Sequence, residues 1–244
     1  MKLTYATYSC IGGREINEDA VELRQEEDCL VVVVADGLGG HDKGEVASAV
    51  VAKTIAEEMP LVKKQNVETL ITVMQQAQNR LLQVQKEESS VNAMKTTAVT
   101  LVTDAKYAYL AHVGDSRAYA FRKLLGYKRT LDHSVPQMMV CSGQMEEKEI
   151  RNHPDRNSLL RVFGIPWEKE MIEVMRPMKL RWIQAFLLCT DGFWELIEET
   201  QMQQCLKRAR TPKEWLEAMA DIVKMNGKDK EMDNYTAAAV FMGR

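Results

Sequence analysis

The chain has 244 residues, a length that predicts one or two domains. Hydrophobic residues make up 45%, enough for a sizeable core, and 32 basic residues nearly balance 35 acidic ones. The formal charge of −3 argues against a nucleic-acid-binding surface or a polybasic membrane patch. No apolar run approaches the roughly 18 residues of a membrane span, and the first residues lack the order of a signal peptide. The five cysteines are scattered without a C-x-x-C pair, so we expect reduced thiols in a cytoplasmic protein.

Short β-branched and aromatic runs predict strands, and longer runs with apolar residues at helical spacing predict helices. Thr211 is a suitable helix cap because Pro212 follows it in the first turn, and Asp104 lies in a predicted hairpin turn. In chain order we expect strands over 3–10, 20–24 and 29–35, helices over 45–58 and 67–88, strands over 97–103, 106–113, 116–122, 172–177 and 185–189, helices over 193–209 and 212–225, and a last strand over 236–242.

Strands and helices do not alternate regularly along this chain. A doubly wound parallel sheet requires such alternation, so the order favours an α+β fold with mostly antiparallel sheets and helices on their outer faces. The sequence contains no internal repeat, low-complexity tract or linker, and residues 1–244 are therefore predicted to form a single domain.

Carboxylates recur where predicted strands begin or end. An Asp-Gly pair is also a strong signal of a β-hairpin turn, and that interpretation holds for any single instance. However, Asp36-Gly37 is followed by a Gly-rich segment and a helix pattern, and Asp191-Gly192 is followed by a run with helical spacing. These two pairs therefore end buried strands without forming hairpins. The six carboxylates at strand ends are Glu18, Asp19, Asp36, Asp115, Asp191 and Asp233.

Carboxylates at the edge of a core are costly unless a cation meets them. No pair of His or Cys is suitably spaced for Zn²⁺, so the group favours Mg²⁺ or Mn²⁺. Glycine beside an aspartate lets a backbone carbonyl approach a metal closely. Two such ions bridged by one carboxylate can ionise a water for in-line attack on phosphorus. The residues thus suggest a metal site at a sheet edge and make a phosphate ester a reasonable substrate.

Ten runs of residues, in this order, resemble the PPM (type 2C) family of metal-dependent Ser/Thr protein phosphatases, in particular its short bacterial branch. They cover nearly the whole chain. The runs are REINED (14–19), ADGLGGH (35–41), GEVAS (44–48), TTA (96–98), HVGDSRAY (112–119), DHS (132–134), RNHP (151–154), LRVFG (160–164), CTDGFWE (189–195) and DNYT (233–236).

The resemblance implies a fold and a role for each matching residue. The fold would be two packed antiparallel β-sheets flanked by α-helices, an αββα sandwich with metals in a cleft at one end. Arg14 would grip the substrate phosphate, because a guanidinium binds it bidentately. Asp36 would bridge two ions, of which Glu18 and the Gly37 carbonyl would bind one and Asp191 and Asp233 the other. Asp115 with Asp191 would hold a weaker third ion. Asp19 and Asn234 would orient ligands and metal-bound waters.

The chain departs from the eukaryotic branch of the family at one position. There, a histidine two residues after the bridging aspartate is the proposed general acid; here that residue is Leu38. His41 is one alternative for protonating the leaving group, although a loop histidine is more often structural. His133 matches a family motif, and we expect its role to be mainly structural.

Residues 135–157 form a charged segment without a strong strand pattern. The resemblance implies a flap beside the active site that influences substrate choice. A solvated helix and loop on the surface fits the same charge pattern.

Together these observations predict a protein-serine/threonine phosphatase that uses two or three Mn²⁺ or Mg²⁺ ions and a water bridging two of them. The expected partners are Ser/Thr-phosphorylated proteins and a cognate kinase, with neither nucleic acid nor membrane, and a monomer is expected. One alternative is a catalytically silent module that keeps the fold. Another is a regulatory phosphatase acting on an anti-anti-sigma protein, for which the chemistry would be the same.

Overall fold

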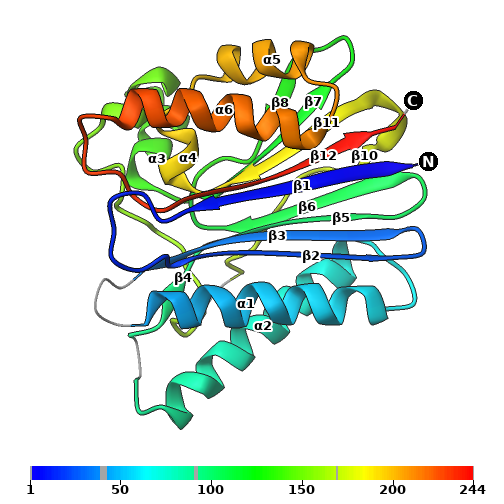
Figure 1. Cartoon of the computed structure of the whole chain (residues 1–244). Coiled ribbons are helices and arrows are strands. Elements are labelled where there is room, and N and C mark those ends of the chain that lie inside the picture. The colour runs from blue at the N-terminus through cyan, green and yellow to red at the C-terminus, as the bar shows by residue number, and fades with distance from the viewer. Residues whose placement is uncertain (1, 39–42, 91–92, 169, 244) are drawn as a thin grey trace.

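Two antiparallel β-sheets pack face to face, and helices cover their outer faces (Figure 1). The structure is a computed structural model that describes residues 2–38, 43–90, 93–168 and 170–243. The first sheet has the strand order β1-β12-β11-β7-β8. Its strands are β1 (Leu3–Cys10), β12 (Tyr235–Met242), β11 (Ile183–Cys189), β7 (Arg117–Arg122) and β8 (Tyr127–Arg129).

The second sheet has the order β10-β6-β5-β3-β2, with β4 paired to β3 and β9 paired to β6. Every strand pair in both sheets is antiparallel. The strands are β2 (Asp19–Glu26), β3 (Cys29–Leu38), β4 (Lys95–Thr96), β5 (Ala98–Thr103), β6 (Tyr107–Val113), β9 (Glu173–Val174) and β10 (Met178–Lys179).

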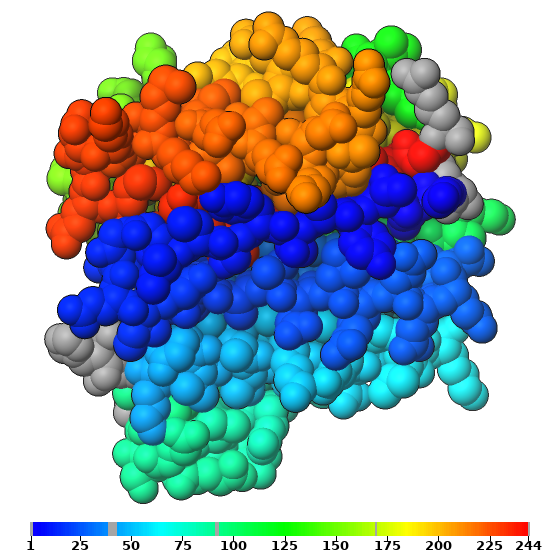
Figure 2. Space-filling view, viewed as in Figure 1, coloured from blue at the N-terminus to red at the C-terminus, as the bar shows by residue number. Residues whose placement is uncertain are grey.

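Helices α1 (Gly44–Glu58) and α2 (Val67–Glu87) cover the second sheet, and α5 (Glu199–Arg208) and α6 (Pro212–Gly227) cover the first. The space-filling view shows the N-terminal segment as a band between these two sets of helices (Figure 2). Among the described residues, no helix is both long and apolar enough to cross a bilayer. The shorter elements are η1 (Met59–Leu61), α3 (Val135–Cys141), η2 (Glu147–Asn152), η3 (Leu180–Trp182) and α4 (Asp191–Trp194).

Strand β3 contributes side chains to two layers of the core. Its side chains alternate: Val31, Val33 and Ala35 pack against α1 and α2. Leu30, Val32 and Val34 pack between the two sheets. This period of two explains why the strand reads as a continuous apolar run, since both of its faces are buried. The next residue on the inter-sheet face is Asp36, at the end of the strand.

The predicted elements agree with the structure, with two corrections. The helix expected over 193–209 is broken into α4 and α5, because Glu198 starts a new capping box with Gln201. The strand expected over 172–177 is reduced to the two residues of β9. The cap is confirmed: the Thr211 hydroxyl accepts a hydrogen bond from the Glu214 amide at 3.2 Å. The α+β fold of two antiparallel sheets with flanking helices is also confirmed.

Candidate active site

A cavity of about 200 Å³ opens at the end of the sandwich where β3 and β11 finish and where β2 and β12 begin. Residues far apart in the sequence meet there because antiparallel neighbours alternate in direction, so that the end of one strand lies beside the start of the next. Its lining residues are Arg14, Glu18, Asp36, Gly37, Leu38, Asp115, Asn157, Leu159, Asp191 and Asp233. All seven residues predicted to hold metal or phosphate are among them.

Asp36 and Asp19 occupy directly opposed positions of the β2–β3 pair, so their side chains share the inter-sheet face. The Asp36 backbone is fixed from the neighbouring segment: its amide donates to the Thr97 hydroxyl at 3.2 Å, and its carbonyl accepts from Thr96 Oγ1 at 2.7 Å. The Asp19 carboxylate accepts a hydrogen bond from Thr190 Oγ1 at 2.9 Å. Both aspartates are thus held by threonine hydroxyls from neighbouring segments.

Asn234 joins the two ends of the chain at the cavity. Its Oδ1 accepts from the Glu18 amide at 2.8 Å, and its Nδ2 donates to the carbonyls of Ile11 and Ile16 at 2.8 and 3.0 Å. These bonds fix the loop between β1 and β2, which carries Arg14 and Glu18. Asn234 therefore positions two of the predicted functional side chains through their backbone.

Gly37 is required by close packing of backbone against backbone. A Cβ atom there would collide with the Gly44 carbonyl and lie 2.7 Å from the Glu18 carbonyl oxygen. The Gly37 amide donates to that Glu18 carbonyl at 3.1 Å. The absence of a side chain brings the start of α1, the end of β3 and Glu18 together on one wall of the cavity.

The cavity carries more negative charge than its surroundings neutralise. Burial, followed by repulsion from Asp191, raises the pKa of Asp36 and of Asp115 well above the usual range. Burial also raises the pKa of Asp191 and of Glu18, with repulsion from neighbouring carboxylates adding to both. For Asp19, burial raises the pKa to about 7. A folded protein that gathers uncompensated carboxylates in this way is built to receive positive charge.

Several of these oxygens are buried without a hydrogen-bond partner: Glu18 Oε1, Asp19 Oδ1 and Asp115 Oδ1. Buried acceptors are almost always satisfied, so orphaned carboxylate oxygens around one cavity fit a cation as the missing partner. Within the described residues, no three carboxylates bring oxygens within 4.8 Å of one another. The carboxylates are spread around the cavity and do not converge on one point, an arrangement that suits more than one ion.

Arg14 lies at the mouth of the cavity and forms a two-pronged ion pair with Asp233, with N–O distances of 2.9 and 2.8 Å. Both side chains are about half exposed. A second cavity of about 400 Å³ adjoins the first, with Arg14, Asn157, Asp191 and Asp233 on the walls of both. Its remaining wall includes Arg151, Asn152, Arg156, Gly192, Glu195, Leu196 and residues 230–232. The cleft is therefore polar and carries both signs of charge.

The segment 135–157 contributes to this cleft through η2 and the turn that follows it. Ile150 is buried, and Arg151 donates to the Trp194 carbonyl at 3.2 Å and to Glu199 at 2.8 Å. The segment is thus anchored beside the site at its end and more exposed before that, at 141–149. His41 lies outside the described residues.

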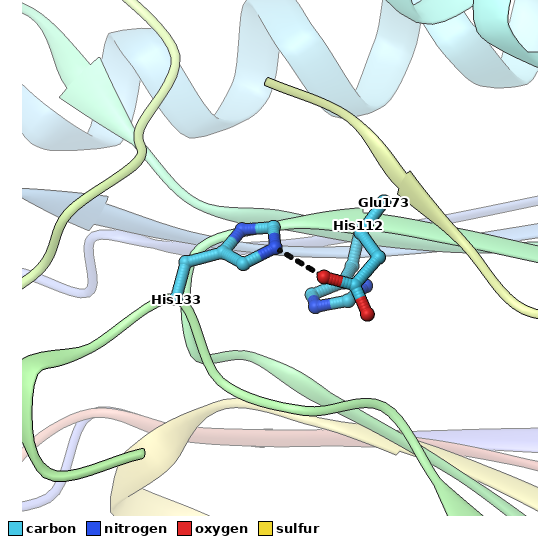
Figure 3. A group of neighbouring side chains, drawn as sticks. All are labelled: His112, His133 and Glu173. Carbon is cyan, nitrogen blue, oxygen red and sulfur yellow. Dashed lines mark hydrogen bonds and ion pairs between the residues drawn. The ribbon is translucent and has the colours of Figure 1, made fainter. Parts of the chain in front are cut away.

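A second group of potential metal ligands lies near Asp115 and consists of His112, His133 and Glu173 (Figure 3). One ligand atom from each lies within 4.8 Å of the others. The two imidazoles stack with centroids 4.4 Å apart, and His133 Nε2 lies 3.2 Å from a Glu173 oxygen. Spacing alone would permit a metal here.

The hydrogen bonds of this group argue against a metal. His133 Nδ1 accepts the Gly114 amide at 3.1 Å, so its proton lies on Nε2, the nitrogen that faces Glu173. Arg161 places a guanidinium nitrogen 3.3 Å from the same atom, and its positive charge opposes a cation. His112 Nε2 donates to the Leu131 carbonyl at 2.7 Å. The histidines therefore brace the turn before Asp115, which fits the structural role expected for His133.

Other contributors to the site had no role assigned from sequence. Thr96 and Thr97 fix the Asp36 backbone, and Thr190 bonds Asp19. Trp194 donates its indole N–H to the Asp115 carbonyl at 3.1 Å. The motifs containing these residues are visible in the sequence, but their partners are distant in the chain, so no local pattern reveals the contacts.

Comparison with known proteins decides the family. A family profile described as protein phosphatase 2C matches residues 7–235. The serine/threonine phosphatase Stp of Listeria monocytogenes is 31% identical over 233 residues, covering 93% of this chain and 90% of that protein. The chain belongs to the protein phosphatase 2C family. This confirms the resemblance and the predicted enzyme class, a phosphoprotein phosphatase.

Solved structures of protein phosphatase 2C relatives share the fold. The serine/threonine phosphatase Stp1 from Staphylococcus aureus superimposes with a TM-score of 0.89, at 24% identity, covering 100% of this chain and 96% of that one. The catalytic domain of the phosphatase PstP, solved in complex with two manganese ions, gives 0.82 at 22% identity, covering 98% and 97%. These likenesses confirm the two-sheet architecture.

Proposed function

We propose that this chain dephosphorylates phosphoserine and phosphothreonine in proteins by metal-assisted hydrolysis. The observation that carries the proposal is the single cavity lined by Arg14, Glu18, Asp36, Asp115, Asp191 and Asp233. Its unpartnered carboxylate oxygens and raised pKa values support binding of divalent cations. Oxygen ligands without histidine or cysteine fit Mn²⁺ or Mg²⁺, and manganese is present in the solved PstP relative.

The family resemblance supplies the ligand assignments, and all of the assigned residues line the cavity. Asp36 would be shared by two ions, with Glu18 and the Gly37 carbonyl binding one and Asp191 and Asp233 the other. Asp115 with Asp191 would hold a third. When bound, such ions lower the pKa of a bridging water and stabilise charge on phosphate oxygens.

The side chains of this protein would orient the substrate and hold the site together. Arg14 presents a planar guanidinium at the cavity mouth, where it now bonds Asp233. If Asp233 bound a cation instead, the guanidinium would be free to bind two phosphate oxygens together. Asn234 holds the backbone of Glu18, and Asp19 accepts a hydrogen bond from Thr190 next to Asp191. Leu38 lines the cavity where the eukaryotic branch has its proposed acid, so protonation of the leaving oxygen comes from another group.

The wider cleft next to the cavity supports a protein substrate. It is open, polar and partly formed by residues 151–157, consistent with a flap over 135–157 that contacts residues flanking the phosphorylated side chain. We further propose that the chain acts as a single cytoplasmic domain and a monomer, opposite a Ser/Thr kinase. A catalytically silent module is disfavoured because every predicted metal ligand lines the cavity.

The test is phosphate release from phosphoserine and phosphothreonine peptides. Release is expected with Mn²⁺ or Mg²⁺ and is expected to stop in excess chelator, and Asp191→Ala should abolish it. Calorimetric titration separates the silent module from the enzyme. Two or more cation sites with turnover support the enzyme, whereas one or none without turnover supports the module. Turnover that persists in chelator contradicts the mechanism.

A further inference from the structure

Trp194 connects the segments that carry two cavity carboxylates, Asp191 and Asp115. It is the last residue of α4, the single turn that begins with Asp191 after β11. Its indole N–H donates to the backbone carbonyl of Asp115, in the turn that connects β6 of the second sheet to β7 of the first, at 3.1 Å. Trp194 is 2% exposed, so this hydrogen bond is shielded from water.

The turn at Asp115 is held from several sides: Gly114 bonds His133 through both its amide and its carbonyl, and Arg117 of β7 pairs with Cys189 of β11. Gly114 has a φ of +104°, and a Cβ there would lie 2.5 Å from Thr97 side-chain atoms. Thr97 Oγ1 also lies 2.7 Å from Ser116 Oγ, so Thr97 holds one side of the loop. Trp194 holds the other. The Asp115 carboxylate, with one buried oxygen lacking a partner, projects onto the cavity wall.

The indole is itself fixed by two arginines. The Arg117 guanidinium carbon lies 3.4 Å from the ring centroid, and this arginine is anchored to Asp132 by hydrogen bonds of 2.8 and 2.6 Å. Arg151, which lines the substrate cleft, donates to the Trp194 carbonyl at 3.2 Å. A cation–π contact and a backbone hydrogen bond therefore leave the ring little freedom to move.

We propose that Trp194 is a positioning residue that sets the separation of Asp115 and Asp191 by tying the turn between β6 and β7 to α4. This inference rests on the proposed function, in which Asp115 and Asp191 share the weaker third cation. Because outer contacts orient ligands, loss of the indole N–H should weaken that cation selectively. In the proposed assignment, the cations held by Glu18, Asp36 and Asp233 take no ligand from the Asp115 turn.

The experiment compares Trp194→Phe with Trp215→Phe in the full chain. Trp215 is a matched control: it is fully buried, and its indole N–H also donates to a backbone carbonyl, that of Met202, at 2.9 Å. Mn²⁺ binding is followed by electron paramagnetic resonance of the free ion. In Trp194→Phe the weakest site should lose about tenfold in affinity while the tighter sites stay within about twofold. Trp215→Phe should leave every site unchanged.

Activity gives a second readout. In Trp194→Phe the Mn²⁺ concentration for half-maximal phosphate release should rise by a similar factor, with kcat recovering at saturating Mn²⁺ and the peptide KM unchanged. Equal effects in the two variants, or equal weakening of all sites, would mean that Trp194 only stabilises the fold and would overturn the proposal. Wild-type protein that binds no cation at all would overturn the proposed function instead.

A measurement on the wild-type chain keeps the inference testable if Trp194→Phe does not fold. The sequence has four tryptophans, so Trp167→Phe, Trp182→Phe and Trp215→Phe identify by elimination the indole N–H signal of Trp194 in a proton–nitrogen spectrum. Titration with diamagnetic Mg²⁺ should shift this signal in its weakest binding phase and leave the Trp215 signal in place. A Trp194 signal that does not shift in that binding phase contradicts the proposal.

Discussion

Two groups of buried carboxylates lie close together in this protein and behave in opposite ways. Asp132 is buried against Arg117 and Arg129, with N–O distances of 2.6 and 3.4 Å. Its pKa is lowered: burial opposes ionisation, but the two arginines outweigh it. Asp36 is buried among aspartates, and its pKa is raised well above the usual range.

The difference lies in whether the fold supplies its own positive charge. Around Asp132 it does, so the cluster is a closed structural unit that rigidifies the molecule. Around Asp36 it does not: Arg14 at the cavity mouth is half exposed, and among the described residues it forms an ion pair with Asp233 alone. We therefore expect a buried carboxylate that is paired with an arginine to contribute to the stability of the fold. We expect a buried carboxylate without such a partner to bind a metal ion. Four experiments test this contrast.

The largest effect is expected for Asp36→Asn. Phosphatase activity should fall at least about a thousandfold, a barrier increase of roughly 4 kcal/mol, because the shared ligand is lost. The metal-free fold should be at least as stable as wild type, because a repelled carboxylate becomes neutral. Steady-state kinetics and urea unfolding measure the two quantities. Asp104→Asn, a turn aspartate at the opposite end of the sheet, is the control, with activity within about twofold. Full activity in Asp36→Asn excludes the assignment.

Asp132→Asn should give the reverse pattern. It leaves the fully buried Arg117 without its bidentate partner, so the free energy of unfolding should drop by about 3–5 kcal/mol. Activity per folded molecule should change far less than in Asp36→Asn. Urea denaturation and kinetics at low temperature distinguish the two. A stable but inactive Asp132→Asn protein would place Asp132 in the catalytic group and remove the contrast.

Cations should stabilise the fold in a pH-dependent manner. The raised pKa values mean that the folded, metal-free state binds more protons than the unfolded state above about pH 4, so its stability falls as pH rises. Mn²⁺ at a hundred times its Kd should add about 2.7 kcal/mol at pH 8, an increase in Tm of about 5–10 °C. The increase should shrink as the pH falls toward 5, because protons compete for the same oxygens. Thermal scans with and without Mn²⁺ measure it, and a shift independent of pH argues against carboxylate ligands.

The smallest effect is expected for Arg14→Lys. An ammonium cannot make the two-pronged contact, so kcat/KM should fall about tenfold, or about 1.4 kcal/mol. Stability should change by less than about 1 kcal/mol, because the Arg14–Asp233 pair is exposed. Arg24→Lys is the matched control: its side chain is equally exposed and ion-paired to Glu57 at 3.9 Å, and its activity should not change. Equal activity in both variants removes Arg14 from phosphate binding.

The sequence located the strand ends that carry Asp36 and Asp191 but missed the break in one helix. Asp36 and Asp191 follow apolar runs that are buried on both faces, so a polar residue there marks the sheet edge unambiguously. The helix expected over 193–209 was wrong because its apolar spacing continues across Glu198, whereas the Glu198 amide donates to Gln201 Oε1 at 2.9 Å and a new helix starts there. Whether a helix continues or restarts depends on a single local hydrogen bond, which leaves no trace in the apolar spacing, whereas a strand of buried valines is plain in the sequence.

In the candidate site, the carboxylates could be predicted from the sequence, whereas the residues that hold them in place could not. Carboxylates were identified because their residue type and position were unusual. Asn234, Thr97 and Trp194 contact residues 216, 61 and 79 positions away, and such pairings depend on which strands become neighbours. The buried partners of Asp132 were likewise invisible, since nothing near Arg117 in the sequence distinguishes a core arginine from a surface one.

Strand β12 has a consequence for how the enzyme is made. It lies between β1 and β11, pairing with both, and Asp233 and Asn234 immediately precede it. Until translation reaches residues 233–242, a nascent chain therefore lacks both Asp233 and the strand that joins β1 to β11. We expect products truncated before Asp233 to be inactive, so that activity would appear only when synthesis of the chain is nearly finished.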